Sequence, residues 1–209
     1  MALDHEYALV GGFNRSHVGR WMQQVAALVS AAAVFLLLTL VDLAHTFGVD
    51  AKLPPVVLAA FGAGAVYAAL YFVFEKWLWK LGPLGRLLNV PNLAGKWSCE
   101  GLGKDQDPPR PWSGTATIVQ SWDRIRVHLQ TAQSSSDSVA AALIHDAAAG
   151  HRLMYHYRNH PRIGERELSA HHGFAELTFA ADGRFATGEY FNGRGRNTFG
   201  TMTLEREDG

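Results

Sequence analysis

Aromatic, basic and hydroxyl side chains gather in four short segments of the C-terminal half of the chain. The first, residues 120–126, sets Trp122 beside Arg124 and Arg126. Aromatic rings stack on nucleobases, and arginine pairs with phosphate through two parallel hydrogen bonds. The segment therefore fits a flat, anionic ligand, although a core tryptophan with solvated arginines explains it equally well.

The second segment, residues 131–138, is rich in hydroxyl groups and includes Thr131 and Ser136. Hydroxyl groups at the start of a strand can line a polar cavity and donate to phosphate or sugar oxygens. Clusters of Ser and Asp more often form turns, and this interpretation is the stronger one for the segment taken alone.

The third segment, residues 154–159, ends at Asn159 and precedes the pair His171 and His172. In a strand Tyr155 and Tyr157 share one face, because side chains alternate. The two adjacent histidines would point in opposite directions, and no Cys or carboxylate completes a metal-ligand spacing. We expect no metal site.

The fourth segment, residues 190–198, contains Tyr190, Arg194 and Arg196 around a Gly-rich turn. Two arginines in such a loop can close on an anionic ligand, with backbone N–H groups adding to the site. An Asn-Gly turn with solvent-facing arginines is the alternative.

The sequence contains no recognisable catalytic set, so we predict a protein that is not an enzyme and has no cofactor. Its one cysteine, Cys99, excludes an intrachain disulfide. Residues 95–209 carry 13 Lys and Arg against 14 Asp and Glu. This balance argues against a surface that binds DNA or RNA polymers.

The elements that must position these groups are short strands. Period-2 alternation and turn signals such as Asn192–Gly193 predict an all-β domain over residues 95–209. Its eight expected strands cover residues 95–101, 114–122, 124–130, 134–145, 152–158, 168–179, 184–191 and 199–206. We predict a small eight-stranded antiparallel β-barrel, since closure removes exposed edges, with a two-sheet sandwich as the alternative.

Two hydrophobic runs, residues 25–41 and 53–74, precede that domain and predict two transmembrane α-helices. A buried helical pair in a soluble protein, or a cleaved signal peptide for the first run, is less well supported. In the second run, Gly62 and Gly64 belong to a series of small residues that permits close helix packing. That packing joins either two copies of the chain or the two spans of one copy.

Positive residues flank the two runs, whereas residues 42–52 between them hold one Lys and two Asp. The positive-inside rule then predicts a multi-pass membrane protein with both termini cytoplasmic. We expect a cytoplasmic segment (1–20), a transmembrane hairpin (21–80), a linker (81–94) and a β-barrel sensor domain (95–209).

The segments NLAGKWSCEG, LMYHYRNHP, HHGFAEL and GEYFNGRGRNTFGTMTLER, behind two spans, resemble the two-transmembrane, β-strand-rich effectors of CBASS antiphage signalling. The resemblance extends from about residue 21 to the end. It implies a protein of the bacterial inner membrane whose barrel binds a cyclic oligonucleotide, with a cyclic dinucleotide as the expected ligand. It also implies self-association in the lipid bilayer and disruption of the inner membrane.

The resemblance and the chemistry together give eleven candidate ligand-binding residues: Trp122, Arg126, Tyr155, Tyr157, His171, Tyr190, Arg194 and Arg196, with Thr131, Ser136 and Asn159 as weaker candidates. The nucleotide would either activate the effector or hold it inactive until its loss. A membrane-tethered barrel that binds another small ligand, such as a lipid, or a partner protein remains the alternative.

Overall fold

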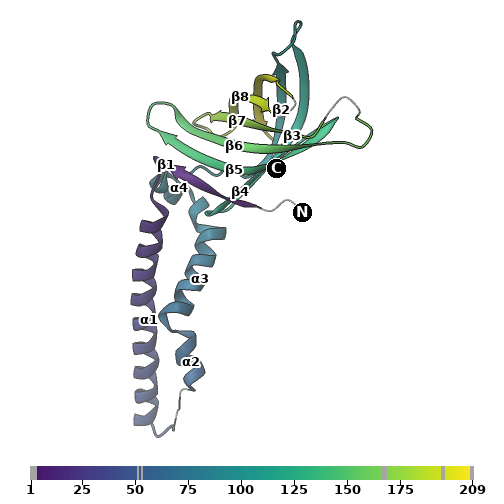
Figure 1. Cartoon of the computed structure of the whole chain (residues 1–209). Coiled ribbons are helices and arrows are strands. Elements are labelled where there is room, and N and C mark those ends of the chain that lie inside the picture. Colours follow the sequence, from purple (N-terminus) through teal and green to yellow (C-terminus); the bar gives the residue numbers. More distant parts are fainter. Residues whose placement is uncertain (1–3, 51, 53, 166–168, 194–195, 208–209) are drawn as a thin grey trace. The chain divides into compact units, whose positions relative to one another are not determined.

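The computed structural model describes residues 4–207 except residues 51, 53, 166–168 and 194–195. The chain divides into two compact units (Figure 1). A helical unit comprises Phe13–Trp79, and a β-rich unit combines Met1–Gly12 with Lys80–Gly209. The expected starts of the second hydrophobic run at residue 53 and of one strand at residue 168 lie outside the described residues.

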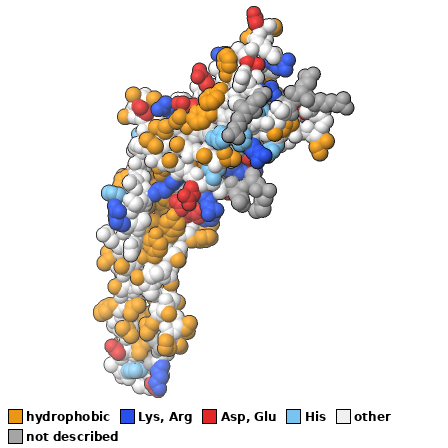
Figure 2. All heavy atoms as spheres, in the orientation of Figure 1, with side chains coloured by type: hydrophobic (Ala, Val, Ile, Leu, Met, Phe, Trp, Pro, Cys, Tyr) orange, Lys and Arg blue, Asp and Glu red, His pale blue; other side chains and the backbone are white. Residues whose placement is uncertain are grey.

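The first span is one continuous helix, α1 (Arg15–Thr46), capped by the Asn14 side chain, which accepts from Ser16 N at 2.9 Å. It is the one described helix that is long and apolar enough to cross a membrane by length and composition. Its buried residues recur every four positions, at Val18, Met22, Ala26 and Ser30. This spacing places them on one helix face. Figure 2 shows hydrophobic side chains along this unit.

The second hydrophobic run does not form one continuous helix. It forms α2 (Pro55–Ala60) and α3 (Ala63–Lys76), with Phe61 and Gly62 between them. Pro55 begins α2, as expected of a residue whose missing N–H costs little in a first turn. The Ser30 hydroxyl donates to the Phe61 carbonyl, so α1 satisfies one backbone group that the interruption leaves open.

The predicted linker contains regular structure. A short 3-10 helix, η1 (Leu78–Lys80), is followed by α4 (Gly82–Leu88). Asn89 ends α4 in the left-handed conformation, with φ 53°. Asn is one of the few residues that adopt this conformation readily at a helix end.

The β-rich unit has nine strands rather than eight: β1 (His5–Val10), β2 (Gly95–Gly103), β3 (Arg110–Gln120), β4 (Arg124–Thr131), β5 (Ser134–Asp146), β6 (Gly150–Pro161), β7 (His171–Phe179), β8 (Phe185–Gly193) and β9 (Phe199–Arg206). The order β1-β4-β3-β2-β9-β8-β7-β6-β5 closes into a barrel. All pairs are antiparallel except β1–β5, which is parallel.

The additional strand, β1, comes from residues 1–20, which were expected to form a cytoplasmic segment ahead of the barrel domain (Figure 1). It lies between β4 and β5 at one end of the barrel, pairing Tyr7–Val10 in parallel with residues 141–144. At the other end β4 and β5 pair directly. Gly11 follows β1 at φ +75°, where a Cβ atom would lie 2.1 Å from the His145 carbonyl oxygen. Only glycine fits there.

The core fills one half of the barrel. Its largest fully buried side chains include Trp97, Trp122, Ile118 and Leu153. Gln120 links this core to the linker: its Oε1 accepts from Leu93 N at 2.8 Å, and its Nε2 donates to Pro91 O at 3.2 Å.

Candidate functional site

The other half of the barrel interior is polar. On β5, β6 and β7 the buried residues alternate with exposed or half-buried ones, as in strands with one inward face. At one end these inward positions carry polar side chains, and the buried ones are Ser134, Ser136, Tyr157, Asn159 and His171. Buried polar groups need hydrogen-bond partners, so their arrangement decides what this end can bind.

Two chains of hydrogen bonds hold the polar end. Tyr157 Oη donates to Asn192 Oδ1 at 2.8 Å, and Asn192 Nδ2 donates to Thr198 Oγ1 at 2.7 Å. Asn159 Nδ2 donates to Ser134 Oγ at 2.9 Å. The other side-chain atom of Asn159, Oδ1, is buried and has no hydrogen-bond partner among the described residues. It is an open acceptor for the donor of a ligand.

Glycine creates the room for these groups. Gly173 on β7 lies opposite Tyr157 in the register. A Cβ atom there would lie 2.4 Å from the Tyr157 ring and 2.7 Å from Asn192 Oδ1. The ring of Tyr157 therefore occupies the space that a side chain at position 173 would fill.

Aromatic faces accompany the polar groups at the same end. Trp112 on β3 donates from Nε1 to Tyr190 Oη at 2.9 Å, and the two ring centroids lie 5.7 Å apart. The rings of Tyr155 and Tyr157 are 6.0 Å apart on β6. The edge of such rings is polar and the face is apolar, which suits the stacking of a heterocycle.

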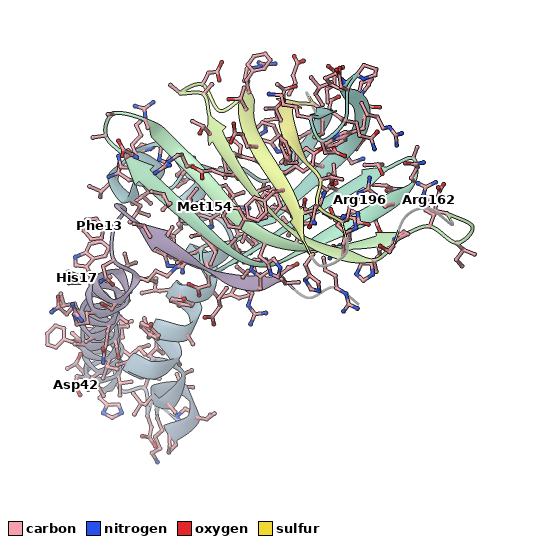
Figure 3. All side chains as sticks on the ribbon, turned by 45° about the horizontal axis from the view of Figure 1, so that its top comes forward. Phe13, His17, Asp42, Met154, Arg162 and Arg196 are labelled. Atoms are coloured by element: carbon pink, nitrogen blue, oxygen red, sulfur yellow. The ribbon has the colours of Figure 1, made fainter. Side chains whose placement is uncertain are left out.

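Burial has the largest effect on the titratable groups at this end, and Arg196 acts on three of them. Burial raises the pKa of Tyr157 and of Tyr190, and the positive charge of Arg196 opposes both increases. Burial lowers the pKa of His171, and Arg196 lowers it further. His171 also contacts the Ser169 carbonyl through Nδ1 at 2.8 Å. Figure 3 labels Arg196 at the same end of the barrel as Arg162.

The structure brings together seven of the eleven candidate residues at this end: Thr131, Ser136, Tyr157, Asn159, His171, Tyr190 and Arg196. Tyr155 lies one inward position deeper on β6. Two candidates lie elsewhere. Trp122 is a core residue, 1% exposed. Arg126 is on the outer face and pairs with Asp137 at 3.1 Å. Arg194 lies outside the described residues.

Sequence reasoning missed Trp112, Ser134 and Asn192. Alternation provides the signal for Trp112, because it has the parity of Ala116 and Ile118, both of which are buried. Asn192 was assigned only to a turn, whereas the structure places it inside β8. Its side chain thereby becomes part of the interior.

Cys99 lies deeper in the barrel, and burial raises the pKa of its thiol to about 12. In the part of the chain that the structure describes, no three His, Cys, Asp or Glu side chains are close enough to hold a metal ion. The arrangement is suited to binding a ligand with flat rings and negative charge.

Comparison with known proteins adds two family matches. Residues 16–80 match the family described as Cap15, TM helices, and residues 88–206 match Cap15, cyclic dinucleotide receptor domain. The chain is also 44% identical over 202 residues to CD-NTase-associated protein 15 of Yersinia aleksiciae, covering 97% of each protein. The strand β1 lies outside both family matches.

Proposed function

The chain belongs to the Cap15 family of CBASS effectors, and from this premise we propose that the polar end of its barrel binds a cyclic dinucleotide. The observation that carries the proposal is the buried, open acceptor Asn159 Oδ1, one inward position along β6 from Tyr157, whose pKa the charge of Arg196 lowers. A base offers donors to Asn159 and a face to the tyrosine rings, while a phosphate pairs with arginine.

The proposed consequence of binding is a change in self-association of the membrane helices, which disrupts the inner membrane. A ligand shifts such an equilibrium only if it binds the two states with different affinity. Several small residues support association: Gly64, Ala65, Ala68 and Ala69 lie on an exposed face of α3. Their spacing of four residues permits close approach of a second helix in lipid.

Membership of the family also supports a receptor rather than an enzyme. We further propose that both spans cross the inner membrane and that both termini are cytoplasmic, because the flanking charges follow the positive-inside rule.

The test uses the full chain purified in detergent, with unfolding followed by tryptophan fluorescence in the presence of a panel of cyclic di- and trinucleotides. A ligand at 100 times its Kd stabilises the folded form by about 2.7 kcal/mol. We expect one cyclic dinucleotide to raise Tm by several degrees.

The variant Arg196→Gln should lose most of this shift and keep the Tm of the ligand-free protein. Arg124→Gln is the matched control, because Arg124 is exposed on β4 at the opposite end of the barrel. Equal shifts in both variants would remove Arg196 from the site. No shift with any cyclic nucleotide would contradict the proposed function.

A further inference from the structure

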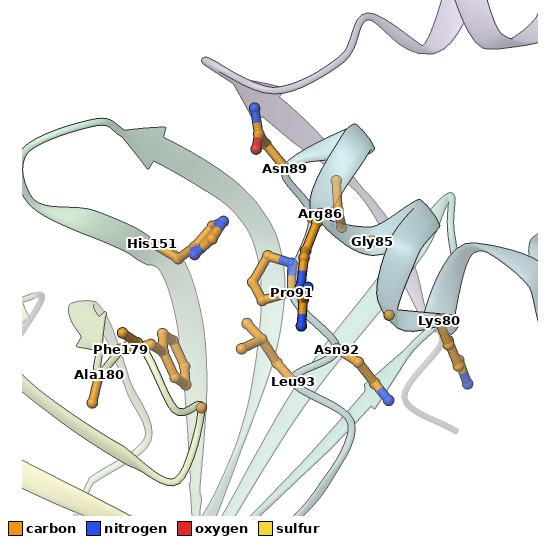
Figure 4. A pocket seen from close by; sticks show the side chains of 14 residues that line it. Lys80, Gly85, Arg86, Asn89, Pro91, Asn92, Leu93, His151, Phe179 and Ala180 are labelled. Atoms are coloured by element: carbon orange, nitrogen blue, oxygen red, sulfur yellow. The ribbon is translucent and has the colours of Figure 1, made fainter.

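A second cavity lies at the opposite end of the barrel from the polar site. This cleft of about 360 Å³ is formed by Lys80, by α4 and the segment that follows it, by His151 at the start of β6, and by the turn between β7 and β8 (Figure 4). All of its lining residues belong to the β-rich unit. None of them belongs to the nucleotide site proposed above.

The lining residues carry positive charge and no carboxylate. Lys80 and Arg86 contribute two cations, and Asn89 and Asn92 contribute amide groups. His151 faces the same space, and its buried Nε2 atom has no hydrogen-bond partner among the described residues. Cations together with neutral donors and no carboxylate favour a phosphate-bearing anion.

The wall behind these groups is apolar. Pro91, Ala180 and Ala181 line the cleft and stay partly or fully exposed, and the lining also includes the buried Val90, Leu93 and Phe179. An inorganic anion makes no use of such a wall, whereas a phosphate attached to an apolar moiety does. The chemistry of the cleft therefore fits an amphipathic phosphate.

The chain itself ties the cleft to the end of the second span. Lys80 directly follows the helical unit, and Arg86 comes six residues later, on α4. On either side of Arg86, Leu81 is 53% exposed and Leu87 is 64% exposed. Exposed leucines next to cations are typical of a segment at a membrane surface.

From these observations we infer that the cleft binds the phosphate headgroup of an anionic membrane phospholipid. Lys80 and Arg86 pair with the phosphate, His151 and the two asparagines hold its polar substituents, and the apolar wall contacts the glycerol region. Basic residues immediately cytoplasmic of a span attract anionic lipids in this way. The inference stands independently of which nucleotide the barrel binds.

The test measures Tm of the full chain in detergent with short-chain lipids. Dioctanoyl phosphatidylglycerol should raise Tm, and dioctanoyl phosphatidylcholine, which has no net charge, should not. The double variant Lys80→Gln/Arg86→Gln should bind phosphatidylglycerol roughly thirtyfold more weakly, given the contribution of each basic residue near an anionic surface. Lys96→Gln/Arg124→Gln removes the same charge from exposed positions that do not line the cleft and should bind normally.

Three results would overturn the inference. The cleft variant could retain its shift with phosphatidylglycerol, or phosphatidylcholine could act equally well. Inorganic phosphate could reproduce the shift, which would assign the cleft to a soluble anion.

The cleft variant is also tested with the cyclic nucleotide and should respond like the unaltered protein. Loss of the nucleotide response alone would place the nucleotide in the cleft and contradict both proposals, whereas no nucleotide response in any protein contradicts only the proposed function.

Discussion

At the level of single residues, the packing of the polar end of the barrel depends on a glycine, Gly173. Gly173 lets the Tyr157 ring lie across β7, where a Cβ atom would be 2.4 Å from the ring. The ring in turn brings its hydroxyl to Asn192 at 2.8 Å. One methyl group at position 173 must therefore displace the centre of the proposed nucleotide site.

We predict that Gly173→Ala lowers both stability and nucleotide affinity. Overpacking of a filled interior typically costs about 1–3 kcal/mol, and the displaced Tyr157 loses its partner. Gly193→Ala is the control, because nothing lies within 4 Å of a Cβ atom there. Thermal unfolding with and without the cyclic dinucleotide measures both effects. Equal behaviour of the two variants would show that the Tyr157 ring can move without loss.

The buried His171 predicts a dependence of stability on pH. Burial and the charge of Arg196 lower its pKa in the folded state. The unfolded chain, with a histidine pKa near 6.5, therefore binds more protons as the pH falls. Without ligand, the free energy of unfolding should decrease between about pH 7 and pH 5.

Replacing His171 with Gln should make this decrease smaller, because the folded state no longer excludes that proton. His160→Gln serves as the control, since His160 is exposed. Denaturant unfolding at several pH values gives the slope for each variant. A slope in His171→Gln as steep as in the control would show that His171 does not cause the loss.

The site residues show what a sequence can establish at this scale. We predicted Tyr157, His171, Tyr190 and Arg196 as ligand-binding residues from the side-chain types that a nucleotide site requires. The structure brings these four residues together. The same reasoning could not distinguish Trp122, which is buried at the other end of the barrel. The type of a residue indicates the chemistry that its side chain can perform. The end of the barrel at which it lies depends on strand register, and a single sequence does not specify that register.

At the level of elements, β1 differs from the other eight strands because it precedes α1 in the chain, whereas they all follow α4. The strand has only six residues, and no tight turn joins it to a neighbouring strand. Only contacts distant in sequence define such a strand, so the pattern reasoning that found the others had no signal for it. The interruption of the second span had a signal in Gly62, which was assigned to helix packing instead.

Tyr7 anchors β1, because it is 2% exposed and its hydroxyl lies 3.4 Å from the Ser121 carbonyl oxygen. We predict that Tyr7→Ala destabilises the barrel by about 3 kcal/mol, as for other large aromatic truncations in a core. Glu6→Ala, on the exposed side of the same strand, should change stability by less than about 0.5 kcal/mol. Tryptophan fluorescence during denaturant unfolding reports on the barrel. Equal values would mean that β1 adds little to the fold.

At the level of the whole molecule, two compact units are joined by the chain at two places, between Gly12 and Phe13 and between Trp79 and Lys80. The first connection follows the barrel strand β1, and the second precedes the basic cleft. A change in the β-rich unit can therefore reach both ends of the helical unit through the chain. This double connection suits an effector in which binding at one unit controls the state of the other.

The exposed face of α3 that carries Gly64, Ala65, Ala68 and Ala69 is the proposed contact between two copies of the chain. Within one chain a Cβ atom at Gly64 meets nothing within 4 Å, so the absence of a side chain there serves no contact inside the unit. If a second copy packs against this face, Gly64→Leu separates the helices and should abolish growth arrest in a bacterial host that produces the nucleotide. Ala27→Leu adds bulk to an exposed position of α1 and should leave toxicity unchanged. Both purified variants should keep the nucleotide-induced shift in Tm, which separates a defect in assembly from a defect in binding. Growth arrest by Gly64→Leu as strong as that of the unaltered chain would show that α3 does not associate through this face.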